Sequence, residues 1–165
     1  MTTFSTAFKP STNKAGLARA EYIGYEVREG VKSKTDTNGE ITERPWKLLN
    51  IIFEIRGVAR GSFQKMSVTC GFTYADDNTL GITLKALGYK PPVIETIFDE
   101  EGFEIEAVQE DEEGFEVADE INFGIEEFLK EVEGKIFLAK VYRAAEGKQK
   151  GYWQIDHKTL TPMHK

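Results

Sequence analysis

Cysteine and histidine are scarce in this 165-residue chain, which contains one cysteine, Cys70, and two histidines, His157 and His164. A single cysteine excludes an intramolecular disulfide scaffold and fits a reducing compartment. Because both histidines lie near the C-terminus, the chain lacks side chains at the spacing of a zinc site. The acidic residues do not follow the alternating ligand pattern of a calcium-binding EF-hand loop. The sequence therefore predicts no metal and no other cofactor.

Long apolar runs are also missing. The first fifteen residues contain no apolar stretch of signal-peptide length, and no later segment approaches the roughly 18 apolar residues of a membrane span. There is no glycine-rich phosphate loop, and neither histidine has a nucleophile in its local sequence. None of the many carboxylates stands out as a general acid or base. We therefore expect a cytoplasmic protein that is not an enzyme and does not enter a membrane.

The chain does have an acidic island. Residues 98–133 hold sixteen Asp or Glu and one lysine, and the hexapeptide Asp-Glu-Glu-Gly-Phe-Glu occurs twice, at 99–104 and at 111–116. Residues 1–97 carry 13 Lys or Arg against 10 Asp or Glu, and residues 134–165 carry seven against two. The formal net charge of −7 thus conceals two mildly basic flanks around an anionic insertion.

Apolar periodicity predicts five strands and two helices. The expected strands cover residues 17–27, 46–58, 63–74, 135–143 and 152–157, and the expected helices cover residues 76–88 and 122–134. The polar segment from Lys32 to Glu43, with its Asn38-Gly39 pair, is expected to be a long hairpin tip. Asp76 or Asp77 is expected to cap the first helix and Asn122 the second.

The chain length fits one domain. Residues 1–15 are expected to form a flexible N-terminal arm, and residues 16–165 a single domain in which residues 91–133 are the acidic insertion. The two Gly-Phe-Glu copies of the insertion are expected to pair as a small hairpin. Residues from Pro162 onward are expected to be a tail.

The order of three strands, a helix, an insertion with a second helix and two closing strands is the order of an OB-fold barrel. We therefore expect a mainly β, α+β chain that forms a five-stranded OB-like antiparallel barrel, with a helix between strands 3 and 4. The same order is compatible with another small antiparallel α+β sheet.

Along the chain lie Gly-Tyr-Glu-Val at 24–27, an aliphatic strand at 48–55, a helix ending in Leu-Lys-Ala-Leu-Gly at 84–88, the segment 134–141 and the closing strand 152–156. In this layout the chain resembles the DUF669-like bacteriophage proteins. The resemblance implies an OB-like single-stranded DNA-binding protein of phage replication or recombination. None of these segments is a diagnostic motif, so the resemblance identifies no individual binding residue.

Binding of single strands without sequence specificity requires cations along the phosphates and flat side chains on which bases stack. The closing hairpin supplies both, and three further cations surround the turn between the second and third strands. The candidate nucleic-acid-binding residues are Arg56, Arg60, Lys65, Lys140, Tyr142, Arg143, Lys148, Lys150, Tyr152 and Trp153. For any one of these aromatic residues, ordinary packing in a sheet is favoured over stacking on bases. For the basic residues as a group, a role in binding and a role in solubility alone are about equally favoured.

Three interpretations of the acidic island remain open. It can be a solvated decoration, or it can compete with DNA for the basic face while Phe98, Phe103 and Phe115 anchor a replication or recombination protein. Alternatively, the protein as a whole is an acidic interaction module or DNA mimic that binds a basic host or replication protein. Formation of a homo-oligomer is left open by the sequence.

Overall fold

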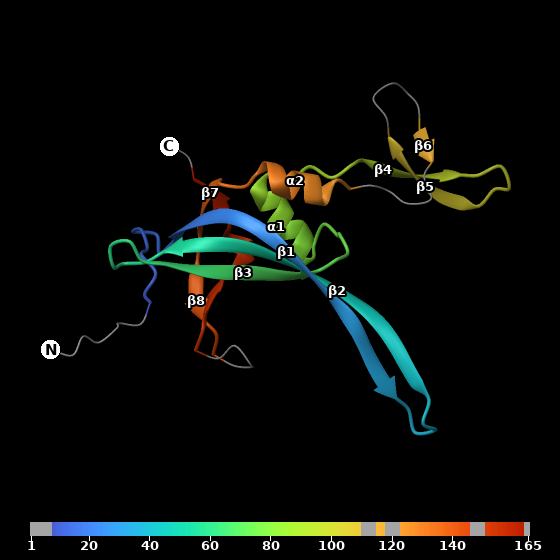
Figure 1. The fold of residues 1–165 in the computed structure, drawn as a ribbon. Coiled ribbons are helices and arrows are strands. Elements are labelled where there is room, and N and C mark those ends of the chain that lie inside the picture. The colour runs from blue at the N-terminus through green and yellow to red at the C-terminus, as the bar shows by residue number, and fades with distance from the viewer. Residues whose placement is uncertain (1–7, 110–114, 118–122, 146–150, 164–165) are drawn as a thin grey trace.

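The computed structural model describes residues 8–109, 115–117, 123–145 and 151–163. In this part of the chain it contains antiparallel β-sheets and two α-helices (Figure 1). The elements are β1 (Ala18–Thr35), β2 (Ile41–Arg56), β3 (Phe63–Gly71), α1 (Thr79–Leu87), β4 (Ile94–Phe98), β5 (Glu104–Gln109), β6 (Phe115–Val117), α2 (Ile125–Glu131), β7 (Ile136–Ala139), β8 (Val141–Arg143), β9 (Trp153–Ile155), a 3-10 turn (His157–Thr159) and β10 (Thr161–Pro162).

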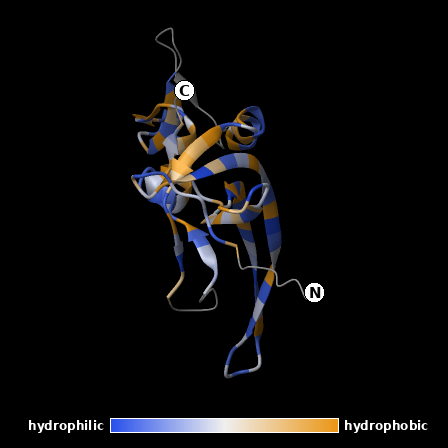
Figure 2. Ribbon diagram, turned by 90° about the vertical axis from the view of Figure 1, so that its left-hand side faces the viewer, coloured by the Kyte–Doolittle hydropathy of each residue, from blue (hydrophilic) through white to orange (hydrophobic). Residues whose placement is uncertain are grey.

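The body of the protein is a five-stranded sheet in the order β10-β7-β1-β2-β3. Alternation along β2 and β3 sends every second side chain to the inner face, as the sequence predicted. This buried face includes Ile51, Phe53 and Val68, and α1 packs Leu84 against it. Figure 2 shows hydrophobic residues gathered in this body. The mainly β, antiparallel class expected from the sequence is confirmed.

The second half of the expected fourth strand and the expected fifth strand form a separate two-stranded sheet, β8-β9. The predicted strand 135–143 is broken at Lys140, where the chain leaves the five-stranded sheet and enters this hairpin. At the break, the Lys140 backbone N–H donates to Thr159 Oγ1 at 2.8 Å, and its carbonyl accepts from the Asp156 N–H at 2.9 Å. Residues of β9 come close to β3, but no hydrogen-bonded ladder joins these two strands in the described part of the chain, so no closed barrel is present there.

A long ribbon made by β1 and β2 projects from the body (Figure 1). The two strands pair from Ala20 with Ile55 out to Thr35 with Ile41, whereas β3 ends where Gly71 pairs with Leu48. The segment from Lys32 to Glu43 is thus the end of a hairpin, as expected, but its assignment to a loop is wrong, because the turn covers only residues 36–40. Most of that segment is strand, and both faces of it are exposed because no third layer covers them.

Two turns with the same hydrogen-bond pattern close the β1–β2 ribbon and the β4–β5 hairpin. At the ribbon tip, Asp36 Oδ1 accepts from the backbone N–H groups of Asn38 and Glu40, at 2.8 and 2.9 Å. Asp99 does the same for Glu101 and Phe103, both at 2.9 Å. The glycines at the third position after each aspartate have φ of 82° and 89°, a left-handed conformation that favours glycine.

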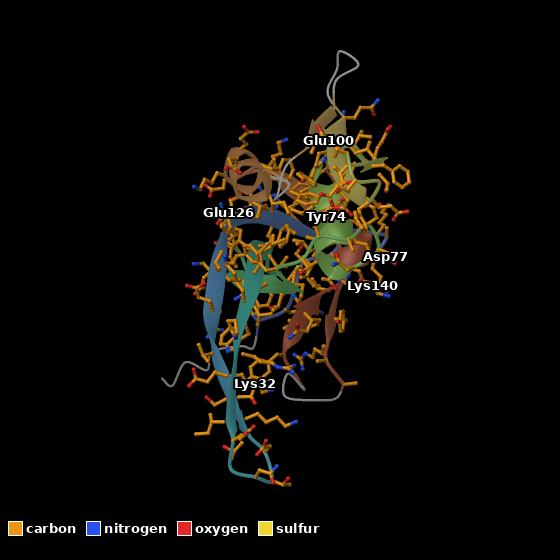
Figure 3. The ribbon with its side chains drawn as sticks, turned by 90° about the vertical axis from the view of Figure 1, so that its right-hand side faces the viewer. Lys32, Tyr74, Asp77, Glu100, Glu126 and Lys140 are labelled. Carbon is orange, nitrogen blue, oxygen red and sulfur yellow. The ribbon has the colours of Figure 1, made fainter. Side chains whose placement is uncertain are left out.

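The acidic insertion folds as a three-stranded sheet, β4-β5-β6. β5 pairs with β6 through Ala107–Val117 and Gln109–Phe115, so strands beginning in each Gly-Phe-Glu copy do form a hairpin, as predicted. The two copies are not opposite each other in the ladder, because Glu104 and Ile105 of the first copy pair with β4. The turn of the second copy lies outside the described residues. This sheet lies at the opposite end of the molecule from the ribbon tip: Figure 3 places Glu100 on the former and Lys32 on the latter.

Both helix starts differ from the prediction. Asn78 caps α1, because its side-chain oxygen accepts from the Gly81 N–H at 2.8 Å, whereas Asp76 pairs with Lys85 at 3.2 Å. The expected stop at Gly88 is confirmed. The second helix begins after Gly124, and Asn122, its expected cap, lies outside the described residues.

The C-terminal tail is shorter than expected. Pro162 pairs with Phe137 as part of β10, and the Met163 N–H donates to the Ile136 carbonyl at 3.1 Å. Among the described elements, neither helix has the length and apolar character needed to cross a membrane.

Candidate nucleic-acid interface

The closing hairpin presents two tyrosines and an arginine to solvent. Tyr142 and Tyr152 are 46% and 63% exposed, and each can offer a ring face to a base. Arg143 lies opposite Trp153 in the ladder, with its guanidinium 4.9 Å from the centre of the indole ring. This cation–π contact holds a positive charge beside the hairpin surface.

Trp153 has a structural role that the sequence could not reveal. Its indole N–H donates to the carbonyl of Phe8 at 3.0 Å, and the ring packs against the core cluster. One edge of the ring is thus occupied by the N-terminal segment and one face by Arg143. The structure therefore favours the packing interpretation for this aromatic side chain.

Phe8 connects the closing hairpin to the turn between β2 and β3. A Cβ added at Gly57 would stand 2.7 Å from the Phe8 ring, and the Val58 N–H donates to the Lys9 carbonyl at 2.8 Å. Pro10 bridges to Gly57 as well. A segment that the sequence placed in a flexible arm thus lies, from Phe8 onward, between Trp153 and the turn.

The predicted cations of this turn have different surroundings. Arg56 precedes the Gly57–Gly61 bend and Arg60 lies within it; both are exposed, and Lys9, which is also exposed, lies on the neighbouring N-terminal segment. Lys65 lies on the outer face of the sheet, directly opposite Glu54 in the ladder, which lowers the local positive potential. The β2–β3 turn and the closing hairpin therefore form one basic region. Lys65 contributes less to its positive potential than the other cations, because Glu54 lies opposite it.

Two of the candidate lysines, Lys148 and Lys150, fall outside the described residues. Lys140 is exposed at the break between β7 and β8. Burial lowers the pKa of His157, which lies in the 3-10 turn after β9. This histidine is therefore neutral at physiological pH and adds no charge to the region.

Two of the three predicted partner-binding phenylalanines have side chains that the structure describes. Phe98 and Phe103 are each 66% exposed, at the two ends of the Asp99 turn. Phe98 pairs with Glu104 in the ladder, so its ring stands among carboxylates. The side chain of Phe115 is outside the described residues.

The ribbon carries functional candidates that the sequence interpretation missed. The cross-strand partners Lys32–Arg44, Gly30–Trp46 and Arg28–Leu48 occupy the same face as Lys34 and Thr42, because directly opposed residues of an antiparallel pair point to the same side. Within residues 28–34 and 42–48, all of which the structure describes, this face holds four cations and no acidic side chain. The acids Glu29 and Glu43 point to the other face. A strand alternation counted through the supposed loop would have revealed this segregation.

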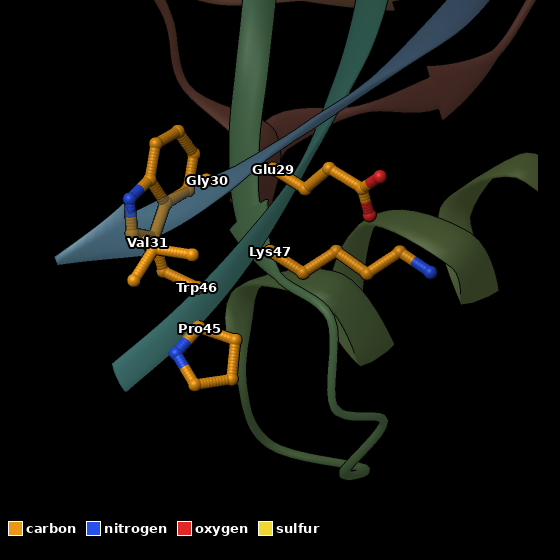
Figure 4. Close-up of a pocket in the computed structure, with 6 residues that line it drawn as sticks. All are labelled: Glu29, Gly30, Val31, Pro45, Trp46 and Lys47. Atoms are coloured by element: carbon orange, nitrogen blue, oxygen red, sulfur yellow. The ribbon is translucent and has the colours of Figure 1, made fainter. Parts of the chain in front are cut away.

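The indole of Trp46 covers Gly30 on this face (Figure 4). A Cβ added at Gly30 would stand 2.7 Å from the ring, so only glycine leaves room for it. Trp46 is still 40% exposed. In Figure 4 the side chains of Glu29 and Lys47 point away from Trp46. Together with Gly30, Val31 and Pro45, these three residues line a shallow hollow.

Searches against family models, curated proteins and solved structures found no match. Within the described residues, no group of three or more His, Cys, Asp or Glu is placed to hold a metal ion.

Proposed function

We propose that this chain is an OB-like protein that binds single-stranded DNA without sequence specificity, in replication or recombination of a bacteriophage or mobile element. The mechanism is neutralisation of phosphates by Lys and Arg together with stacking of bases on exposed aromatic rings. The replication context rests on the layout that the chain shares with the phage proteins named above.

The strand order supports the OB-like part of this proposal. β7, β1, β2 and β3 are successive neighbours in the sheet, and β9 comes close to the free side of β3. This is the neighbourhood that a five-stranded OB barrel requires, with α1 between its third and fourth strands.

The observation that carries the binding function is the basic region joined by Phe8. Through the contacts of Phe8 with Trp153 and Gly57, the closing hairpin and the β2–β3 turn lie side by side. Three exposed cations, Lys9, Arg56 and Arg143, lie on the segments that meet at this junction. Two exposed rings, Tyr142 and Tyr152, lie on the same hairpin, and Tyr142 points to the face opposite Arg143 and Trp153. Cations next to exposed aromatic rings are what a single strand needs from a protein that does not read its sequence.

Fluorescence anisotropy with a labelled oligothymidine, at low and moderate salt, tests this function. We expect binding that weakens as salt rises, because neutralised phosphates release counterions. The same measurement on a variant in which a short Gly-Ser linker replaces residues 91–122 shows whether the acidic insertion competes with DNA. Absence of binding at low salt by both proteins would refute the proposal.

A second candidate function is supported by the exposure of Phe98 and Phe103. Large apolar rings held in solvent among carboxylates fit an acidic interaction module that binds a basic protein. This alternative predicts no affinity for oligothymidine, and capture of a purified basic replication protein that is lost when both phenylalanines are replaced by Ser. The two candidates therefore make opposite predictions for nucleic acid.

A further inference from the structure

We propose that the basic face of the β1–β2 ribbon is a second binding surface for single-stranded nucleic acid, separate from the basic region around Phe8. This surface consists of Arg28, Lys32, Lys34, Arg44 and Trp46 and is called the ribbon face below. The inference rests on the proposed function, because it names a further element that contacts the same ligand.

Segregation of charge on the ribbon is the first observation. The ribbon as a whole is mixed in sign, so its composition alone would indicate a solvated hairpin. The register places Arg28, Lys32, Lys34 and Arg44 on one face, and Glu29, Glu43 and Lys47 on the other. The nearest acid along β1 on the cationic face is Glu26, one interval before Arg28. None of the four cations makes an ion pair within the described part of the chain, so their charges are available to an anion from outside.

Spacing along the strand is the second observation. Residues two apart on a strand recur about every 6.7 Å on one face. Lys32 and Lys34 are neighbours at this interval. Arg28 precedes Lys32 by two intervals, and Gly30, with the Trp46 ring over it, lies between them. An extended polyanion lying along β1 would meet positive charge on both sides of a flat ring. A nucleic-acid strand, with its regular phosphates and its bases, has this chemistry.

Trp46 distinguishes this surface from a simple basic patch. Its ring lies over Gly30 and remains 40% exposed in a segment where no core covers it. An indole that is partly exposed beside four cations leaves its ring accessible to a stacking base. Gly30 removes the side chain that would otherwise displace the ring, so the pair forms a platform on which a base can stack.

The position of the ribbon makes the surface accessible. From Arg28 outward, both faces of both strands are largely open to solvent, and the ribbon extends away from the body (Figure 1). The three-stranded sheet β4-β5-β6 of the acidic insertion stands at the other end of the molecule, and Figure 3 shows Lys32 far from Glu100. Among the described residues, that sheet does not cover this face. Helix α2 contacts β1 at Tyr25, whose hydroxyl donates to Glu126 Oε1 at 3.4 Å, before the ribbon face begins at Arg28.

Replacing three of the cations by glutamine tests the proposal. For Lys32→Gln with Lys34→Gln and Arg44→Gln, we expect the slope of log affinity against log salt to fall by about two, at roughly 0.7 per lost single-strand phosphate contact. The affinity for oligothymidine at 0.1 M salt should fall roughly 10- to 100-fold. The matched control removes three positive charges elsewhere, with Lys90→Gln, Lys130→Gln and Lys135→Gln.

The outcomes separate this proposal from the proposed function. If the wild-type protein binds and the ribbon variant keeps both its affinity and its salt slope, the ribbon proposal is wrong and the proposed function stands. If the control variant loses as much as the ribbon variant, the effect is one of net charge, and the ribbon proposal is again wrong. If the wild-type protein does not bind at low salt, both fail. Tighter binding of a hairpin duplex than of oligothymidine would overturn the choice of single strands.

Tryptophan fluorescence gives an independent readout. The protein has two tryptophans, and the N–H of Trp153 is already engaged by Phe8. We expect oligothymidine to quench the emission of the wild-type protein, and the quenching to be lost in Trp46→Phe. Trp46→Ala should weaken binding about tenfold, which corresponds to one lost base-stacking contact. Undiminished quenching in Trp46→Phe would show that the indole does not stack on bases. Circular dichroism should show an unchanged fold, because the ribbon lies outside the core.

Discussion

The hydroxyl of Tyr89 donates a hydrogen bond to the backbone carbonyl of Phe123, and these two residues flank the part of the acidic insertion that carries β4, β5 and β6. The Tyr89 ring also lies 5.2 Å from that of Phe128 in α2, and both Tyr89 and Phe123 contact Tyr74. The chain thus leaves and rejoins the body at one point, fixed by an aromatic cluster.

Removing this hydrogen bond should loosen the point of attachment. For Tyr89→Phe we expect the free energy of unfolding to fall by about 1 kcal/mol, the usual contribution of such a bond. Urea unfolding followed by circular dichroism measures the loss. Tyr142→Phe is the matched control, because it removes the hydroxyl of an exposed tyrosine on the closing hairpin and should leave stability unchanged.

Replacing residues 91–122 by a linker of about six Gly and Ser residues should leave the body folded. The five-stranded sheet and its core receive no strand from this segment, and such a linker can span up to about 20 Å. We expect a cooperative thermal transition and retained β-sheet circular dichroism. A variant that unfolds without cooperativity would show that the insertion supports the core.

Gly30→Ala should displace the indole of Trp46. Because the new Cβ would stand 2.7 Å from the ring, the ring has to move toward solvent. We expect the tryptophan emission to shift to longer wavelength while the thermal transition of the body is unchanged. Gly71→Ala serves as a control, since no atom lies within 4 Å of a Cβ added there. An unshifted spectrum would mean that the ring does not rest on Gly30 in solution.

The protein should lose stability as the pH rises above about 9. Burial raises the pKa of the Cys70 thiol to about 11, so the native state keeps a proton that the unfolded chain releases. A raised pKa gives stability that is complete below the unfolded value and is lost as the pH rises through the folded value. Between pH 8 and pH 10.5 this one thiol should account for about 2 kcal/mol.

Urea unfolding of the wild-type protein and of Cys70→Ala at these two pH values isolates the thiol. The variant should show a smaller loss between pH 8 and pH 10.5, even if it is less stable at both. As a check on burial, the native thiol, which is 2% exposed, should fail to react with a thiol reagent at pH 8 until urea is added. An equal loss in both proteins would contradict the raised pKa of Cys70.

Residues with a buried face were predictable from the sequence. Along residues 49–55 of β2 and 66–70 of β3, every second residue enters the core, so the alternation of apolar side chains appears directly in the sequence. The end of α1 at Gly88 was also predictable, because a glycine commonly follows the last turn of a helix. The pairing of β5 with β6 followed from the repeat, since two copies of one strand-and-turn segment in succession form a hairpin most simply.

The ribbon was not predictable by the same means. Val31 and Ile41, at 60% and 67% exposure, have no core to face, so the outer ribbon shows no apolar alternation and its composition resembles a loop. The informative signal was the Asp36 turn. Because that turn closes within five residues, strands have to flank it immediately.

The candidate site depended on contacts between distant segments. Nothing in the local sequence of Phe8 links it to Trp153, which is 145 residues away. Only the packing of the N-terminal segment between the closing hairpin and the Gly57 bend brings the separate cations of the sequence into one region. Local patterns could identify these cations, but not their arrangement.

The ribbon also leaves strand edges without neighbours, since beyond Leu48 the described β2 pairs only with β1. Such an edge invites another chain to add a strand. Pro45 interrupts the outer edge, because it has no N–H to donate to an incoming strand. The four like charges of the ribbon face would also repel the same face of a second molecule. The protein can therefore carry a long exposed hairpin at high concentration without its molecules pairing edge to edge into an extended sheet.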